Sequence, residues 1–258
     1  MSFGSLGKGN GGFGSSGWES ADPFDGAGDS RDGGGKDFGP RRFWMPAGAT
    51  KRVLFLDSEP FCLYEHGLYS INKSKDQVTC LKKNGIGDQC PLCDAESWPS
   101  FVGHFSVIDM GDVTNTKGGV TLSGWTSKKG VVYQFGKSLL GAKRGGKDKP
   151  GVLQKLKRLA AKYDNDLSGT VWDIYRSGAK VESVGDEFEF VEKVKKADWK
   201  NYLIGLGANE KYLDLTPHDY QTVFAPKSLD SLKRLVSDAG LGGAAGGPAK
   251  GGFDDADY

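Results

Sequence analysis

The sequence predicts a mainly β fold with minor α content, for three reasons. Short apolar runs recur through the middle of the chain, and turns containing glycine separate them. One basic segment repeats its apolar residues at helical spacing. Both ends of the chain are rich in glycine and almost free of aliphatic residues. Many short strands with one intervening helix favour a five-stranded Greek-key barrel of the OB type.

The two ends are expected to be flexible, with one compact core between them. Residues 1–39 carry three basic and six acidic side chains, a net charge of −3, and too few apolar residues to offset the entropy of ordering. Residues 242–258 have the same character and form a flexible acidic tail. Residues 40–241 are therefore predicted to form the core.

Each expected element follows from a local pattern. Alternating or continuous apolar residues predict strands, lysine and glycine predict a hairpin turn, and apolar residues three or four apart predict helices. The expected strands are 52–56, 60–64, 101–110, 170–176, 180–184 and 186–194, with a hairpin around 128–130. The expected helices are one that begins near Pro150, 197–204, and 228–239 with Gly240 as its C-terminal cap.

The segment 62–93 holds all four cysteines and one of the three histidines. Cys90 and Cys93 form a C-x₂-C pair, Cys80 precedes Cys90 by ten residues, and His66 precedes Cys80 by fourteen. Three thiolates and one imidazole make a closed tetrahedral shell for a single structural Zn²⁺. A small zinc-binding subdomain is therefore predicted at 62–100.

The fourth ligand has two candidates in the sequence. Cys62 and His66 are four residues apart, so on a strand they face the same side and either completes the shell. Cys62 lies in an apolar run, where a cysteine usually behaves as a small buried hydrophobe, so His66 is preferred. His104 has no cysteine near it in the sequence and is expected to be a surface or groove histidine.

These residues resemble a known family. The run His66-Gly67, then Cys80, then Cys90-Pro91-Leu92-Cys93 is similar to the zinc site of phage single-stranded DNA-binding proteins of the T-even helix-destabilising type. The likeness extends loosely over about residues 43 to 240, including 52–56, 133–137 and 228–232. It implies an OB-fold with a zinc subdomain that binds single-stranded DNA without sequence preference. Such a protein acts in phage DNA replication, recombination and repair, in the cytoplasm of the bacterial host.

A basic segment supplies candidate phosphate contacts. Residues 128–162 contain eleven cations and one acid, a net charge of +10, which favours a polyanionic partner over a plain solvated face. The phosphate contacts predicted first are Arg41, Arg42, Lys128, Lys129, Lys143 and Arg144. The resemblance implies Phe101, Tyr133 and Lys137 as further DNA contacts, and Trp125, Trp172 and Tyr175 are additional stacking candidates.

The chain ends in an acidic, aromatic tip made of Phe253, Asp254, Asp255, Asp257 and Tyr258. It resembles the tails by which several single-strand-binding proteins recruit a replication partner, such as a polymerase, helicase or primase. Self-association on DNA is a second expected interaction. The alternative is a tail that only increases solubility.

Catalysis is not predicted. The sequence has neither the H-x-E and P-C-x-x-C pair of zinc deaminases nor a phosphate-binding glycine loop after a strand. No apolar stretch is long enough for a bilayer, and the first residues lack the order of a signal peptide, so a soluble cytoplasmic protein is expected. The remaining alternative is a zinc-containing phage transcription or protein-interaction factor, although Pro99 disfavours a recognition helix after the knuckle.

Overall fold

The computed structural model describes residues 15–16, 40–72, 76–126, 132–133, 135–147 and 149–241. The predicted contacts Lys128 and Lys129 lie outside the described residues. The predicted tail contacts Phe253, Asp254, Asp255, Asp257 and Tyr258 lie outside them as well. Among the described residues, no helix has both the length and the apolar character that a bilayer crossing requires.

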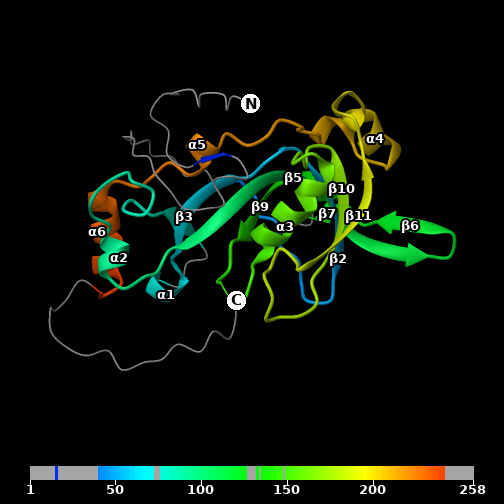
Figure 1. The fold of residues 1–258 in the computed structure, drawn as a ribbon. Coiled ribbons are helices and arrows are strands. Elements are labelled where there is room, and N and C mark those ends of the chain that lie inside the picture. The colour runs from blue at the N-terminus through cyan, green and yellow to red at the C-terminus, as the bar shows by residue number, and fades with distance from the viewer. Residues whose placement is uncertain are drawn as a thin grey trace, which may run out of the picture.

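The described residues form a mainly antiparallel β structure with few helices, as predicted (Figure 1). The main sheet has the strand order β1-β3-β5-β2-β10-β11, with β4 on β3 and with β6 and β9 on β5. Its strands are β1 (Ser15–Ser16), β2 (Thr50–Phe55), β3 (Phe61–Gly67), β4 (Gln77–Thr79), β5 (Ser100–Thr116), β6 (Gly119–Leu122), β9 (Gly136–Lys143), β10 (Thr170–Tyr175) and β11 (Glu187–Lys193). The strands β7 (Trp125–Thr126) and β8 (Val132–Tyr133) pair antiparallel on either side of the predicted hairpin turn, and the turn itself at 128–130 lies outside the described residues.

The long strand β5 organises this sheet. It pairs with β3 over residues 100–104 and with β2 over 107–112. It pairs with β9 over residues 102–109, which overlaps both of those stretches, so β9 occupies the opposite edge. No pairing recorded among the described residues joins the ends of the path, so the sheet is open and the closed barrel stays a prediction.

The predicted helices are confirmed, and short ones accompany them. The helices are α1 (Tyr69–Asn72), α2 (Pro91–Asp94), α3 (Val152–Ala160), α4 (Trp199–Gly205), α5 (Tyr220–Val223) and α6 (Leu229–Asp238), with 3₁₀ turns at Ala161–Tyr163, Lys196–Asp198 and Glu210–Tyr212. The Ser228 hydroxyl accepts the Ser231 N–H at 3.2 Å and caps α6. Gly240, with φ of +72°, follows its last turn.

The strand predicted at 180–184 is wrong, because this segment forms turns. Side chains, in place of a neighbouring strand, form hydrogen bonds with backbone groups in and around this segment. The Arg176 guanidinium donates to the carbonyls of Ala179 and Val181 at 3.0 and 3.2 Å. The Glu182 carboxylate accepts the N–H of Lys143 at 3.0 Å and that of Val152 at 2.9 Å, so it ties the end of β9 to the start of α3.

The buried apolar residues form separate clusters along the molecule. The largest packs α3 against the sheet and includes Trp172, Phe55 and Phe105. Another cluster joins the cysteine-bearing loop to α6 through Leu92 and Leu232. Figure 1 shows α2 and α6 together at one end of β5, opposite the β5–β6 hairpin.

The segment 220–224, which we call the C-terminal segment, is held to the sheet by a small polar network. The Tyr220 hydroxyl donates to the Asp57 carboxylate and lies 2.8 Å from the Ser106 hydroxyl oxygen. The rings of Phe61, Tyr220 and Phe224 stack nearly parallel, with neighbouring centroids 5.0 and 5.9 Å from Phe61. Burial raises the pKa of Asp57, whereas the bond from Tyr220 opposes that rise.

We expect Tyr220→Phe to lower the free energy of unfolding by about 1–3 kcal/mol at pH 7, because it removes a donor from a buried carboxylate. A raised pKa means that the folded protein holds this proton above the ordinary pKa of Asp. The Asp57 contribution to stability is therefore greatest in acid and is lost as pH rises through the raised pKa. Because Tyr220→Phe raises that pKa further, its destabilisation should be larger at pH 7 than at about pH 4.

Thermal unfolding of the variant at both pH values checks this expectation. Tyr202→Phe is the matched control, since the Tyr202 hydroxyl bonds the exposed Glu192 carboxylate at 2.8 Å. Equal losses for the two variants at pH 7 would contradict the role given to Asp57.

Candidate metal centre and nucleic-acid interface

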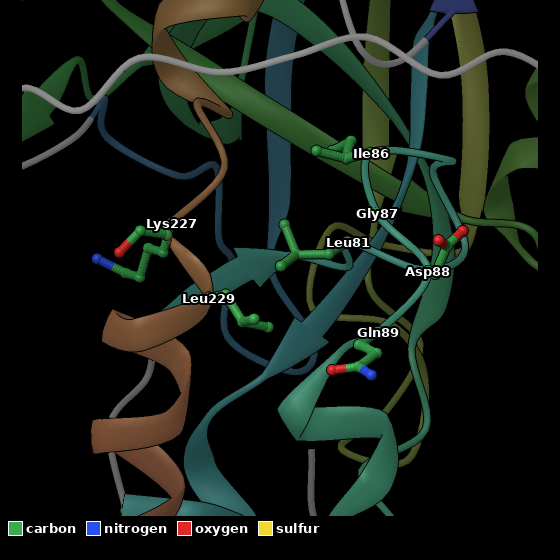
Figure 2. A pocket seen from close by; sticks show the side chains of 8 residues that line it. Leu81, Ile86, Gly87, Asp88, Gln89, Lys227 and Leu229 are labelled. Carbon is green, nitrogen blue, oxygen red and sulfur yellow. The ribbon is translucent and has the colours of Figure 1, made fainter.

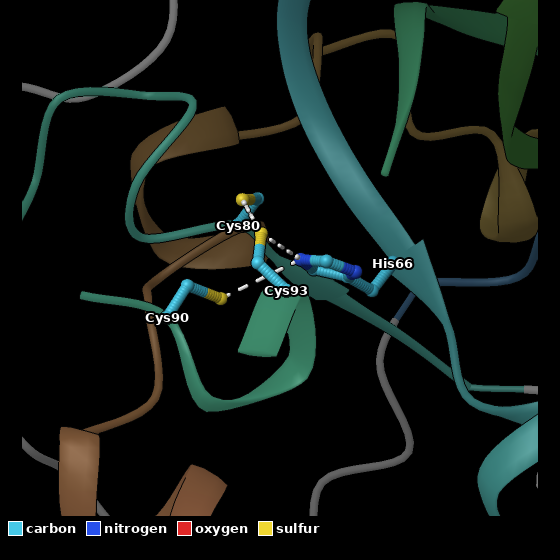
Figure 3. Close-up of side chains that lie close together, drawn as sticks. All are labelled: His66, Cys80, Cys90 and Cys93. Atoms are coloured by element: carbon cyan, nitrogen blue, oxygen red, sulfur yellow. Dashed lines mark hydrogen bonds between the residues drawn. The ribbon is translucent and has the colours of Figure 1, made fainter. Parts of the chain in front are cut away.

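The four predicted metal ligands lie together (Figure 3). His66 comes from β3, Cys80 follows β4, and Cys90 and Cys93 come from the start and the interior of α2. Their ligand atoms all lie within 4.8 Å of one another. The first three residues are buried, and Cys93 is half-buried.

The distances in this cluster fit a tetrahedral metal ion. Cys90 Sγ and Cys93 Sγ lie 3.5 and 3.6 Å from His66 Nε2, and Cys80 Sγ lies 3.6 Å from Cys93 Sγ. A tetrahedral zinc ion with ordinary bond lengths requires sulfur–nitrogen edges of about 3.6 Å and sulfur–sulfur edges of about 3.8 Å. These three separations are close to the edges of one such shell.

The thiols compete with one another for ionisation. A hydrogen bond from Cys80, with a second from His66, lowers the pKa of Cys90, and the same contact with Cys90 raises the pKa of Cys80. Burial raises the pKa of Cys93. One thiolate is therefore favoured and the others keep their protons, unless a cation balances all three. A divalent metal supplies that balance and releases the protons.

Contacts around the shell fix its ligands. The Ser97 hydroxyl lies 3.2 Å from His66 Nδ1, the ring nitrogen that faces away from the sulfurs, and the Lys83 N–H donates to Cys80 Sγ at 3.4 Å. The Asn84 side chain accepts the Tyr64 N–H at 2.8 Å. It also donates to the carbonyls of Tyr64 and Cys80 at 2.7 and 2.8 Å. The segment 80–93, which we call the metal loop, is therefore joined to β3 through the side-chain amide of Asn84.

Cys62 is not part of this cluster. Its side chain is 1% exposed and packs in the cluster of the main core. Burial raises the pKa of its thiol to about 12, so it stays neutral. The preference for His66 over Cys62 agrees with this arrangement.

His104 is fully buried, so the expected surface or groove position is wrong. Its Nε2 lies 3.3 Å from the Glu65 carboxylate, and its ring lies 4.2 Å from that of Phe224. Burial lowers the pKa of His104, although the nearby carboxylate opposes the change. The residue joins the sheet to the C-terminal segment and stands outside the metal shell.

An aromatic and cationic row crosses the sheet beside the metal loop. Tyr64 on β3 pairs with Phe101 on β5, and their ring centroids lie 5.0 Å apart. The Arg144 N–H donates to the Phe101 carbonyl at 3.0 Å, and its guanidinium carbon lies 4.7 Å from the Phe101 ring centroid. All three side chains are half-buried. We call Tyr64, Phe101 and Arg144 the cross-strand row.

The other predicted cations are placed differently. Arg41 bonds the buried Asp109 carboxylate at 3.0 Å, and Lys137 bonds the Asp214 carboxylate and the Thr216 carbonyl. Arg42 lies 3.8 Å from Glu65. Lys143 is exposed at the end of β9. Arg41 and Lys137 are therefore engaged within the protein, and Arg144 stands near Phe101. Lys143 pairs with Val102, so its side chain lies on the opposite face of the sheet from Phe101.

Of the remaining predicted aromatics, Trp172 and Tyr175 do not join the row. Trp172 is 1% exposed and donates from its indole to the Thr170 hydroxyl, so no base can stack on it and this prediction is wrong. Tyr175 is half-buried at the far end of β10, where it pairs with Thr50. Trp125 and Tyr133 are partners in the β7–β8 register, and their side chains lie outside the described part.

Sequence reasoning missed three aromatic side chains. Tyr64 belongs to the row, and Trp98 and Trp44 are 84% and 56% exposed. The signal for Trp98 was its place directly after the cysteine knuckle, between Ser97 and Pro99. Trp44 follows the predicted contacts Arg41 and Arg42 in the same short segment.

A hollow of about 380 Å³ lies between the metal loop and the start of α6 (Figure 2). Its walls come from both segments and combine aliphatic side chains with one acid and one base. The lining residues are Leu81, Ile86, Gly87, Asp88, Gln89, Lys227, Ser228 and Leu229. None of the four metal-ligand side chains lines it.

The loop after Cys93 contains a residue in an unfavourable backbone conformation. Glu96 has φ of +59°, in the left-handed region that glycine adopts without a steric penalty. We expect Glu96→Gly to raise the free energy of unfolding by up to about 1 kcal/mol, because the steric cost exceeds the entropy cost of glycine. Thermal unfolding should show a rise of about 2–4 °C. Glu96→Ala keeps the Cβ and should give no rise, so equal gains for both variants would contradict the reason.

No protein-family model, curated protein or solved structure matches the chain.

Proposed function

We propose that this protein binds single-stranded DNA without sequence preference and uses one structural zinc ion to hold its binding surface in shape. The cross-strand row carries the proposal, because it places two aromatic rings and a guanidinium on neighbouring strands beside the metal loop. Such binding requires cations that follow the sugar-phosphate backbone and ring faces that receive bases. The resemblance of residues 66–93 to phage single-strand-binding proteins supports the same function.

Zinc is the metal that fits the donor set best. Three thiolates and one imidazole at tetrahedral separations favour zinc over harder cations, which prefer oxygen ligands. Four protein donors leave no coordination position for a substrate, so the proposed role is structural and the proposed protein is not an enzyme. When bound, zinc supplies the positive charge that lets all three thiols ionise.

The protein side chains do the work of binding in this proposal. Arg144 covers the Phe101 ring at 4.7 Å in the free protein. Contact of its guanidinium with a phosphate would uncover that ring for a base. Asn84 holds the backbone of Tyr64 to that of Cys80, so the metal loop and the row keep a fixed relation. The exposed Lys143 lies on the opposite face of the sheet, so Arg144 is the cation proposed to contact phosphate beside the Phe101 ring.

The wider proposal follows the family resemblance. The sheet is proposed to be an elaborated OB-fold, and the acidic tip from Phe253 to Tyr258 to recruit a replication protein. Phage DNA replication, recombination and repair in the host cytoplasm is the proposed setting. Neighbouring copies on one strand are proposed to interact.

Direct titration tests the proposal. A labelled mixed-sequence single strand should bind with an affinity that falls as salt rises, with a log–log slope of about −0.7 for each phosphate contacted. A second single strand of scrambled sequence should bind equally well. Absence of saturable binding at low salt, with zinc present, would refute the function.

The hollow beside α6 favours one second candidate, a protein-interaction factor. Its aliphatic floor and its Lys227 rim are open to a peptide side chain. Under this alternative the body binds no DNA, and Leu229→Lys abolishes capture of a protein partner. The same titration separates the two candidates.

A further inference from the structure

Trp98 is the most exposed large apolar side chain in the described part of the chain, with 84% of its surface open to solvent. A large exposed ring is informative, since proteins bury most of their tryptophan surface. The residue lies three positions before Phe101, at the entry to β5. It therefore shares one end of the sheet with the cross-strand row.

The loop that carries Trp98 has a defined shape. After α2, the Glu96 N–H donates to the Cys93 carbonyl at 3.1 Å, and the Ser97 N–H donates to the Leu92 carbonyl at 2.9 Å. These two bonds, with Glu96 in the left-handed conformation, form a Schellman motif. The chain thus reverses directly after the last metal ligand, and the indole follows that reversal.

The same loop contacts a metal ligand. Ser97 places its hydroxyl 3.2 Å from His66 Nδ1, while His66 Nε2 faces the sulfurs. A hydrogen bond at Nδ1 fixes the ring orientation that presents Nε2 to a metal. Order at the metal centre and order at the backbone of Trp98 are therefore linked through one side chain.

We propose that Trp98 is a base-stacking contact for unpaired DNA, and that Ser97 is the residue that positions it from the metal centre. This inference rests on the proposed function and extends it to a side chain outside the cross-strand row. The contact is with a base and not with phosphate, because the neighbouring Asp94 and Glu96 are exposed acids that repel a phosphate. An exposed indole stacks on any base, which suits binding without sequence preference.

The first experiment compares Trp98→Leu with Trp98→Phe in titrations of a labelled single strand. Trp98→Leu keeps an apolar side chain but loses the large π face, so we expect about tenfold weaker binding. Trp98→Phe should recover part of the affinity. The salt dependence should stay that of the wild type, because no phosphate contact is lost. Equal affinity of Trp98→Leu and the wild type overturns the stacking role.

The second experiment tests the link to the metal. Ser97→Ala should retain one zinc per chain, measured by atomic emission, yet bind the single strand several-fold more weakly, and Ser97→Thr should restore the affinity. Wild-type affinity for Ser97→Ala overturns the positioning role. If the wild-type protein binds no single strand, the proposed function fails. If the wild type binds and the Trp98 and Ser97 variants bind equally well, the proposed function stands and this inference alone fails.

Discussion

Removal of the metal should lower the melting temperature by about 8–16 °C. An ion present at a thousandfold excess over its dissociation constant stabilises the folded state by about 4 kcal/mol, and each kcal/mol shifts a domain of this size by about 2–4 °C. The effect is large because the shell joins three separate segments. His66 lies on β3, Cys80 follows β4, and the C-x₂-C pair spans α2.

Two cysteine variants make this expectation specific. Cys90→Ala removes a ligand and should lose both the metal and the stability it provides. Cys62→Ala is the matched control, since Cys62 is equally buried but packs in the main core away from the shell. It should keep one metal per chain and lose only the small packing term of a buried cysteine. Melting of the chelated wild type at an unchanged temperature, after zinc analysis confirms removal, would contradict the structural role.

Loss of the Phe101 ring should weaken single-strand binding by about 5- to 150-fold, the range given by base–aromatic stacking energies of about 1–3 kcal/mol. Phe101→Leu is the variant of choice, because Phe101 also packs against the main core and leucine preserves apolar volume. Phe190→Leu is its matched control. Phe190 is 38% exposed and stacks on Tyr163 at 4.7 Å, on β11 and outside the row.

Arg144→Ala should change the salt dependence of single-strand binding as well as its affinity. It removes one proposed phosphate contact, so the slope of log affinity against log salt should become shallower by about 0.7. Lys193→Ala is the control, since Lys193 lies on β11 and pairs with Asp166 at 3.4 Å. Fluorescence anisotropy with a labelled strand measures all four variants. Equal losses for the row variants and the β11 variants would show that the cross-strand row is not the binding surface.

The candidate metal ligands could be predicted because their signal is local. Cys80, Cys90 and Cys93 fall within fourteen residues, so a short loop can bring them together whatever the rest of the chain does. Cys62 was an alternative to His66 as the fourth ligand, because residues four apart on a strand face the same side. The apolar neighbours of Cys62 indicated core packing, and the structure places it there.

Most strands could be predicted from their apolar patterns, and β9 could not. Its sequence GKSLLGAK holds two glycines and two lysines, which are poor strand formers. Pairing along residues 102–109 of β5 supplies what local preference lacks. The predicted strand at 180–184 failed for the opposite reason. The Arg176 guanidinium satisfies the Val181 carbonyl, which a strand ladder would otherwise use, and the Glu182 side chain is engaged by the N–H of Val152.

Exposure of aromatic side chains was the least predictable property. Trp172 and Trp98 are the same residue type, yet Trp172 is buried in the cluster that includes α3 and Trp98 is exposed to solvent. The exposure of each ring depends on which segment, distant in the sequence, packs over it. Arg41 illustrates the same limit for charge, since its partner Asp109 lies on a strand far along the chain.

A competition experiment asks whether the protein selects unpaired DNA over duplex. Zinc-loaded protein is bound to a labelled single strand and is then challenged with unlabelled single strand or with duplex of the same length and sequence. Because the cross-strand row is proposed to receive unstacked bases, the single strand should displace the label at a concentration at least tenfold lower than the duplex. Displacement by the duplex at an equal or lower concentration would show that the protein does not select unpaired DNA.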